Sequence, residues 1–292
     1  MSPAITPIMT PSQISLHVYT DFDSTIVLQD TGNTLLAFEI GEEELGRIDR
    51  LPKTAPGEVS IRKAEDMKWN RLRFTIQEAA DILVDPNDDV LLQSRLGEGA
   101  AEAEAEATSR ASKRMSFDQR SNNRNAERSY YVRLDQGFKR FHRFCQEHNI
   151  PITVVSIGIQ PLIEEMLNRY LGHGHGIVVR ANGLTFQEDG SWKVLWRDTS
   201  PFGVEKGRAL REARANDLKK PSTDQILWCG DGTSDFPAAL ASDIVLARQD
   251  TTLEKVLKAN QMPHRAFTTF DTVLEVVNEW IQEHPRSEDL EP

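Results

Sequence analysis

The fold is decided by the stretch Ile14-Ser15-Leu16-His17-Val18-Tyr19-Thr20-Asp21-Phe22-Asp23-Ser24-Thr25. Its first half is an apolar, strand-like run that ends directly at Asp21. Its second half is a polar turn with two carboxylates, Asp21 and Asp23, at positions i and i+2. A short apolar run followed by a polar turn is typical of a buried parallel strand. We therefore expect a strand over residues 14–20 with both carboxylates at its carboxyl end.

Two later runs repeat this arrangement. Ile152-Thr153-Val154-Val155 ends at Ser156, and a run over residues 225–229 ends at Gly230-Asp231. Two more strands are expected over residues 177–179 and 244–247, and a β-hairpin over residues 184–196.

Helical patterns separate these runs. Apolar residues recur at helical spacing over residues 138–145, 162–171 and 273–281. Strands that alternate with helices predict a parallel sheet covered on both faces, which is a Rossmann-like, doubly wound α/β fold. Ligands of such sheets bind outside the carboxyl ends of the strands. The polar segments that follow the strands are therefore expected to share one site.

The stretch from residue 30 to 130 breaks the alternation. Helical segments are expected over residues 34–45 and 64–83, with no clear strand, so we expect a helical cap inserted after the first strand. Residues 97–128 are of low complexity and carry too few large apolar side chains to offset their ordering entropy. We expect a flexible N-terminus over residues 1–13 and a catalytic core formed by residues 14–29 and 131–283. The cap is expected over residues 30–130, with a disordered insert at 97–128, and a flexible acidic tail over residues 284–292.

Charge and composition limit the possible partners. A net charge of −11 over 292 residues argues against a nucleic-acid or anionic-membrane surface, which needs clustered Lys and Arg. The two cysteines, Cys145 and Cys229, are expected to be reduced and buried. Residues 1–12 have neither a basic start nor a long apolar run. A cytoplasmic location is the expectation, and the oligomeric state is left open.

Two acidic loops carry the first candidate chemistry. Neighbouring carboxylates such as Asp21 and Asp23 cost free energy unless a cation or a proton compensates, which indicates a metal-assisted site; a simple strand-to-turn Asp cluster is the alternative. In Gly230-Asp231-Gly232-Thr233-Ser234-Asp235, Asp231 and Asp235 could complete the oxygen-rich shell that Mg²⁺ prefers. Alone, this segment could also be a calcium-type loop or a turn.

Ser156 and Lys206 are weaker candidates when each is taken alone. The Ser156 hydroxyl and the amides that follow it could bind phosphate oxygens, although a turn leading into a helix is the alternative. Lys206 is expected to start a helix, and a lone lysine is usually a solvated side chain.

The order of these segments is more specific than any one of them. Asp-x-Asp-x-Thr, Ser, Lys and Gly-Asp-Gly-x-Ser-Asp resemble the four motifs of the haloacid dehalogenase-like superfamily, from about Ile14 to Phe270. Residues 132–138, 192–203 and 229–232 look like those of fungal phosphatases of the phosphoserine phosphatase-like branch. That branch includes polyol-phosphate phosphatases and an enzyme of methionine salvage.

The resemblance implies a role for each motif residue. Asp21 would attack phosphorus and become an aspartyl-phosphate, and Asp23 would give a proton to the leaving alkoxide and later take one from water. Mg²⁺ would be held by the Asp21 carboxylate, the Asp23 carbonyl and Asp231. Asp235 would support the metal shell or orient Lys206. Ser156 and Lys206 would hold the transferring phosphoryl oxygens.

Two departures from that pattern concern substrate recognition. Ile157 stands where phosphoserine phosphatases usually have glycine, with Gly158 next, so the phosphate-binding backbone can differ. The glutamate that binds the substrate amine in those enzymes is not evident, and Asp30 and Asn33 occupy its neighbourhood. Polyol or sugar phosphates are therefore more plausible substrates than phosphoserine.

Three alternatives stay open at this point. A dehalogenase has no need of an acid at Asp23, a phosphomutase would keep both aspartates, and a regulatory protein could bind a phosphometabolite without turning it over. Two minor candidates are a metal site at His173 and His175 and a reach of Trp69, Arg71 or Arg73 into the site; a glycine turn and an ordinary amphipathic helix explain them better.

Overall fold

A seven-stranded sheet forms the centre of the computed structural model, which describes residues 15–55, 57–90, 130–217 and 225–285. The strand order is β4-β3-β2-β1-β5-β6-β7, and only the β3–β4 pair is antiparallel. The strands are β1 Leu16–Thr20, β2 Ile152–Ile159, β3 Val178–Phe186, β4 Trp192–Leu195, β5 Gln225–Gly230, β6 Ile244–Arg248 and β7 Arg265–Phe267. The α/β class and the parallel sheet expected from the sequence are confirmed.

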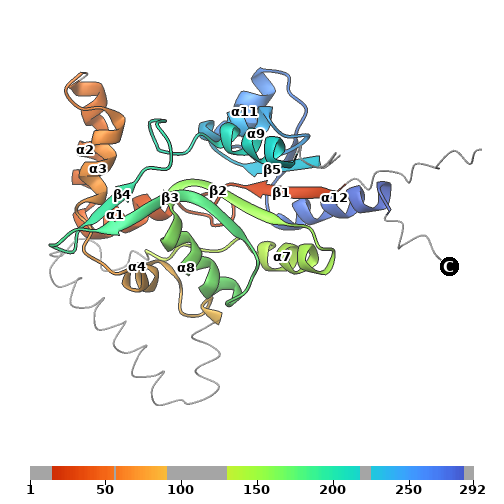
Figure 1. The fold of residues 1–292 in the computed structure, drawn as a ribbon, viewed down its shortest axis with the longest axis horizontal. Coiled ribbons are helices and arrows are strands. Elements are labelled where there is room, and N and C mark those ends of the chain that lie inside the picture. Colours follow the sequence, from red (N-terminus) through yellow and green to blue (C-terminus); the bar gives the residue numbers. More distant parts are fainter. Residues whose placement is uncertain (1–14, 56, 91–129, 218–224, 286–292) are drawn as a thin grey trace, which may run out of the picture.

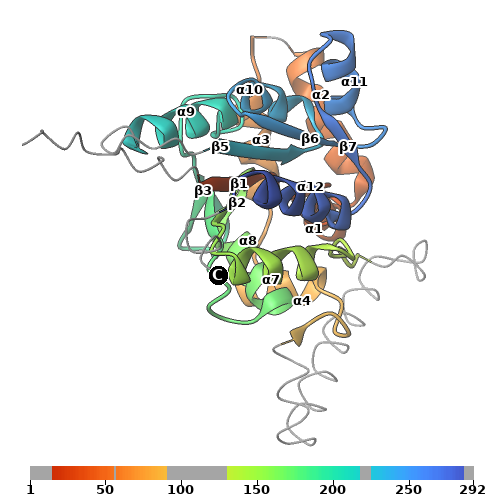
Figure 2. The ribbon, with the colours of Figure 1, turned by 90° about the vertical axis from the view of Figure 1, so that its right-hand side faces the viewer.

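Helices cover both faces of the sheet (Figures 1 and 2). One face packs against α7 Phe138–Glu147, α8 Gln160–Leu171 and α12 Phe270–Glu283; the other packs against α9 Lys206–Asp217, α10 Phe236–Leu240 and α11 Thr252–Ala259. Neighbouring side chains of a strand point to opposite faces. Val18 therefore belongs to the first apolar core and Tyr19 to the second. Burial on both faces is why the strand sequences are apolar throughout rather than alternating.

Within the described residues that follow β1 and precede the return to the core, the helices are α1 Thr31–Ile40, α2 Glu42–Thr54, α3 Ile61–Trp69 and α4 Ile76–Leu83. The expected helices over 34–45 and 64–83 were wrong in extent. Gly41, with a φ of 78°, ends the first, and the second is interrupted after Trp69 until Thr75 caps a new helix. Helices α1 to α3 stand beside one end of the sheet, whereas α4 packs on α8 (Figure 1).

Two expected strands were too short. β2 continues through Ser156 to Ile159, with a register shift against β3 between Val155 and Ile159. Asn182 of β3 donates to the Ile157 carbonyl at 2.7 Å, which ties this irregular stretch to the sheet. β3 itself runs on into the expected hairpin, so a core strand and a hairpin strand are one element. Neither extension is visible as a hydrophobic run in the sequence, because backbone pairing with a neighbouring strand holds each of them in the sheet.

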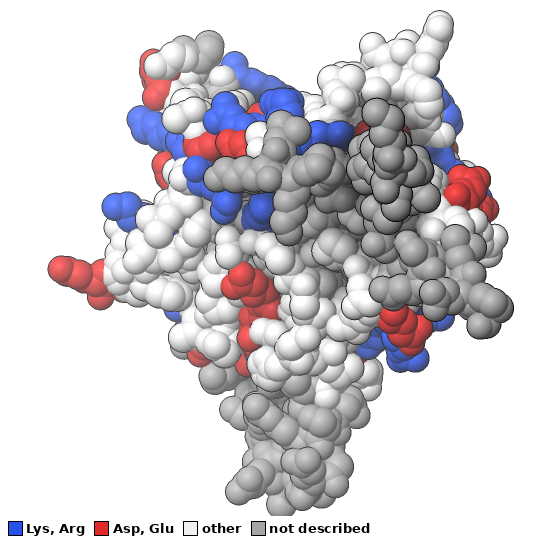
Figure 3. All heavy atoms as spheres, turned by 45° about the vertical axis from the view of Figure 1, so that its right-hand side comes forward, with Lys and Arg blue, Asp and Glu red and all other residues white. Residues whose placement is uncertain are grey.

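Several expectations concern segments outside the described residues, namely 1–13, 97–128 and 286–292. Cys145 and Cys229 are free and buried, as expected. Among the described helices, none is long and apolar enough to cross a membrane. On the face drawn in Figure 3, described basic side chains are interspersed with acidic ones and form no continuous basic surface.

Candidate active site

Asp21 lies at the carboxyl end of β1, in the middle of the sheet. Its backbone N–H donates to the Cys229 carbonyl at 2.9 Å, so the β1–β5 ladder continues to the first residue of the loop. The Phe22 side chain is fully buried, and its N–H donates to Asp21 Oδ1 at 2.7 Å. Ser24 adopts a left-handed φ of 55°, which turns the chain back so that Ile26 N donates to the Phe22 carbonyl at 2.9 Å. The loop is thereby fixed by its own backbone.

Lys206 joins the two acidic loops. It is the first residue of α9, its side chain is 1% exposed, and its Nζ lies 2.7 Å from Asp21 Oδ2 and 2.6 Å from Asp235 Oδ1. Burial alone would lower the pKa of Lys206, but Asp21 and Asp235 outweigh it and hold that pKa above its ordinary value. The ammonium group therefore stays charged at the end of the sheet.

Asp235 fixes the second loop as well as the lysine. Its Oδ2 accepts from the amides of Asp231 and Gly232, both at 2.8 Å, while its Oδ1 accepts from Lys206. This approach requires glycine at position 230, because a Cβ there would lie 2.5 Å from Asp235 Oδ2. Both oxygens of Asp235 are thus already engaged, which fits the expected alternative that it orients Lys206.

Asp21, Asp231 and Asp235 form the cluster that could hold a metal ion. One carboxylate oxygen from each lies within 4.8 Å of the others. Asp231 also accepts from the Thr25 hydroxyl at 3.3 Å, and burial together with Asp235 raises the pKa of Asp231 to about 6. Three carboxylates therefore share one ammonium group. Hard carboxylate oxygens and an excess of negative charge suit a divalent cation such as Mg²⁺.

Asp23 faces away from this cluster, toward the helices that follow β1. Its Oδ1 accepts from the Thr31 amide at 2.8 Å, at the N-terminus of α1. Burial and the neighbouring Asp30 raise the pKa of Asp23 to about 7. A carboxyl group with such a pKa can both give and take a proton near neutral pH.

Ser156, Ile157 and Gly158 lie inside β2 rather than in a loop after it. Ser156 is fully buried, and its Oγ accepts from the Gly158 amide at 3.0 Å. The amide expected to bind phosphate at Gly158 is therefore engaged within the strand. A Cβ on Gly158 would lie 3.2 Å from Ser156 Oγ and 3.6 Å from Asp23 Oδ2, so β2 passes close against the Asp23 carboxylate.

Asp30 and Asn33 flank a pocket that opens beside Asp23. Asp30 caps α1 by accepting from the Asn33 amide at 2.7 Å. Both residues line a cavity of about 240 Å³ together with Asp23, Ile157 and other side chains from α1 to α3 and from the loop before α9. The structure thus brings the two candidates to the same side of Asp23.

Of the minor candidates, the histidine turn and the two arginines follow the simpler interpretations, whereas Trp69 does not. His175 accepts from the Ile177 amide through Nδ1 in a turn between α8 and β3. Arg71 and Arg73 pair at the surface with Glu44 and Asp189. Trp69 is buried and stacks on Trp192 with ring centroids 6.1 Å apart, but it also lines the cavity beside Asp23, so it does reach the site.

Sequence reasoning missed a second layer around the first loop. Arg248 at the end of β6 donates to the Thr25 carbonyl and to Asp135 Oδ2, both at 2.8 Å. Asp135 is buried and also accepts from the Gly137 and Phe270 amides at 2.9 Å. Asp135 could have been found from the sequence, because it lies in the stretch 132–138 that carries the family resemblance. No sequence pattern marked Arg248 as a candidate.

Comparisons with known proteins agree with this architecture. "Polyol phosphate phosphatase PYP1" from Saccharomyces cerevisiae is 33% identical over 149 residues, which cover 49% of this chain and 62% of that protein. "Pdp3-interacting factor 1" from Schizosaccharomyces pombe is 25% identical over 258 residues, or 87% of this chain and 91% of that protein.

A solved structure supports the fold. A substrate-bound phosphoserine phosphatase superposes with a TM-score of 0.51 at 13% identity, covering 90% of this chain and 98% of that one. A family model for haloacid dehalogenase-like hydrolases matches residues 18–240. The predicted resemblance and the hydrolase class are confirmed: this chain belongs to the haloacid dehalogenase-like hydrolase family.

Proposed function

We propose that the chain is a magnesium-dependent phosphatase that hydrolyses small phosphomonoesters through an aspartyl-phosphate on Asp21. One observation carries this proposal: the buried ammonium group of Lys206 lies between the carboxylates of Asp21 and Asp235, 2.7 and 2.6 Å away, at the end of the sheet where Asp231 also lies. Phosphoryl transfer needs positioning and positive charge on the equatorial oxygens more than it needs covalent chemistry.

The first step takes place on Asp21. A carboxylate oxygen of Asp21 attacks phosphorus, and the bond from phosphorus to the leaving oxygen breaks. Asp21 and Asp231 would hold Mg²⁺, with the Asp23 carbonyl, and the cation when bound supplies positive charge to the phosphoryl oxygens. Lys206 and Ser156 would hold the remaining oxygens. Asp235, whose oxygens already bind Lys206 and two amides, would position the lysine.

Asp23 would move the protons in both steps. It gives a proton to the leaving oxygen, and then accepts one from the water that attacks phosphorus, breaks the bond to Asp21 and releases phosphate. Its pKa of about 7 and its place beside the pocket suit this double role. In a dehalogenase there would be no oxygen leaving group for such an acid to protonate.

The substrates we propose are phosphorylated polyols, sugars or related metabolites. The similarity to a yeast polyol phosphate phosphatase supports this class. Helices α1 to α3 would form the cap that shields the aspartyl-phosphate from stray water, within the expected cap region of residues 30–130. We also keep the cytoplasmic location expected from the two buried thiols as part of this proposal.

Release of inorganic phosphate tests the proposal. Wild type should hydrolyse para-nitrophenyl phosphate and a panel of polyol phosphates with Mg²⁺ and lose activity with a chelator, and Asp21→Asn should be inactive although folded. His173→Ala, in the turn after α8, is the matched control and should retain activity. An isomerised phosphoester without free phosphate would indicate a phosphomutase. Ligand binding without turnover in both wild type and Asp21→Asn would favour the binding protein.

A further inference from the structure

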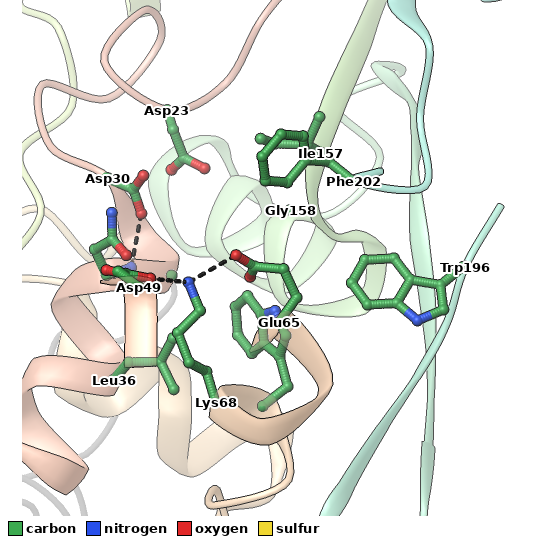
Figure 4. A pocket seen from close by; sticks show the side chains of 13 residues that line it. Asp23, Asp30, Leu36, Asp49, Glu65, Lys68, Ile157, Gly158, Trp196 and Phe202 are labelled. Carbon is green, nitrogen blue, oxygen red and sulfur yellow. Dashed lines mark hydrogen bonds and ion pairs between the residues drawn. The ribbon is translucent and has the colours of Figure 1, made fainter. Parts of the chain in front are cut away.

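The pocket beside Asp23 is small, polar at its floor and formed largely by the helices after β1. Its volume of about 240 Å³ lies below the range of about 300–1,000 Å³ that drug-sized ligands occupy. Asp23 stands at one end, and α1 to α3 supply the polar groups at the other (Figure 4). A leaving group protonated by Asp23 would extend into this space.

Lys68 of α3 rises from the floor of the pocket. Its side chain is 6% exposed, and its Nζ lies 2.8 Å from Asp49 Oδ1 and 2.7 Å from Glu65 Oε1 (Figure 4). Burial alone would lower the pKa of Lys68, but Glu65 and Asp49 outweigh it and raise that pKa. An ammonium group has three N–H donors, and two of them serve these carboxylates. Within the described part of the chain, no partner takes the third.

The charge around Lys68 is negative. Asp30, Asp49 and Glu65 line the pocket with it, so three carboxylates accompany one ammonium group. Asp30 is exposed at the pocket and accepts from the Asn33 and Gly32 amides, while a carboxylate can accept about four hydrogen bonds. The pocket therefore offers one fixed donor and spare acceptors within a net negative field.

Two of the three aromatic side chains that line the pocket, Trp196 and Trp69, make ring contacts with residues outside it. The guanidinium group of Arg62 lies over the Trp196 ring at 4.8 Å, and Trp69 stacks on Trp192. In this net negative field a cationic leaving group would be attracted rather than rejected, so the selection argued below concerns anions.

We propose that Lys68 and Asp30 are specificity residues that select a neutral, polyhydroxylated leaving group and reject an anionic one. This inference rests on the proposed phosphatase function. A hydroxyl group both donates and accepts, so it can take the third N–H of Lys68 and give its own proton to Asp30. A carboxylate or second phosphate in the same place would satisfy Lys68 but face the three carboxylates, and like-charge contacts of this kind disfavour binding.

A matched pair of substrates tests the selection. Sorbitol phosphate and phosphogluconate, each phosphorylated at the terminal carbon, differ in that one ends in a hydroxymethyl group and the other in a carboxylate. Wild type should favour sorbitol phosphate in kcat/KM by about tenfold or more. Equal use of both members of the pair overturns the inference.

Two variants assign the selection to the residues named. Asp30→Asn removes one carboxylate charge and should reduce the preference over phosphogluconate by about fivefold or more. Lys68→Met removes the donor and should lower kcat/KM for sorbitol phosphate relative to para-nitrophenyl phosphate. The leaving group of para-nitrophenyl phosphate has no additional hydroxyl group that Lys68 could bind. Lys63→Met, on the exposed side of the same helix, should change neither ratio.

The outcomes separate this inference from the proposed function. If Lys68→Met does not fold because Asp49 and Glu65 lose their partner, the exposed Asp30 still provides a test, and an unchanged preference in Asp30→Asn sinks the proposal. If wild type releases phosphate from every substrate without regard to charge, the phosphatase stands and the selection fails. If it releases phosphate from none, the phosphatase proposal fails and this inference fails with it.

Discussion

Replacing Lys206 with methionine tests the electrostatic design of the site. The change keeps much of the side-chain volume but removes the only ammonium between Asp21 and Asp235 in the described structure. Removal of one partner from a buried ion pair usually costs about 3–5 kcal/mol. We therefore expect the free energy of unfolding to fall by about 3 kcal/mol at neutral pH, at the low end of that range.

The assay is urea unfolding in a chelator, followed by fluorescence, with phosphate release measured on separate samples of the same protein in Mg²⁺ and without urea. Lys193→Met, on the exposed side of β4, is the matched control and should change stability by less than about 0.5 kcal/mol. In Lys206→Met we also expect phosphate release to fall by about a hundredfold or more, as when a donor to the transition state is removed.

A double variant then identifies the partner. In an Asp235→Asn background, Lys206→Met should cost less than in wild type, with a coupling of about 0.5–3 kcal/mol, because one of the stranded charges is already gone. A stability loss below about 1 kcal/mol in the single variant with most activity kept, or full additivity in the double variant, would refute the reasoning.

Three further predictions concern the surroundings of the site. Asp135→Asn breaks the 2.8 Å ion pair with Arg248 and should lower the free energy of unfolding by about 3 kcal/mol in urea denaturation. An unchanged free energy of unfolding would show that this ion pair does not stabilise the fold. Gly230→Ala places a Cβ 2.5 Å from Asp235 Oδ2 and should cost about 1–3 kcal/mol and raise the Mg²⁺ concentration needed for phosphate release; an unchanged Mg²⁺ requirement would contradict it. In the metal-free protein, burial and Asp235 raise the pKa of Asp231 from 3.8 to about 6, so this group contributes stability that is lost as pH rises through that range. Mg²⁺ should therefore raise the Tm more at about pH 8 than at about pH 5 in scanning calorimetry, and an equal rise at both would refute it.

The sequence predicted the sheet well because its signals are local. Apolar runs such as those ending at Asp21 and Gly230 need only burial on both faces, and a polar turn marks where each one stops. The extension of β2 past Ser156 was missed because it depends on Asn182, a residue of another strand that bonds the Ile157 carbonyl. Such backbone pairing leaves no hydrophobic pattern to recognise.

The candidate site could also be predicted only where its signals are local in the sequence. The motif order grouped Asp21, Asp231 and Lys206 as candidates. The two aspartates lie together because parallel strands end at one edge of the sheet, and Lys206 meets Asp21 from the start of α9. The Lys68 cluster was missed although Glu65 and Lys68 are three residues apart on one helix, a spacing that an exposed pair would share. Its third member, Asp49, comes from a different helix, and only the packing of α2 on α3 makes it a partner.

The central claim is that Asp21 carries the phosphoryl group, and acid quenching during turnover tests it most directly. Enzyme mixed with substrate and Mg²⁺ is stopped in acid, digested and examined by mass spectrometry. The account predicts one added phosphoryl group on the peptide that contains Asp21 and none in Asp21→Asn. Phosphate release by the wild type with that peptide unmodified, and with Asp21→Asn still active, would contradict it.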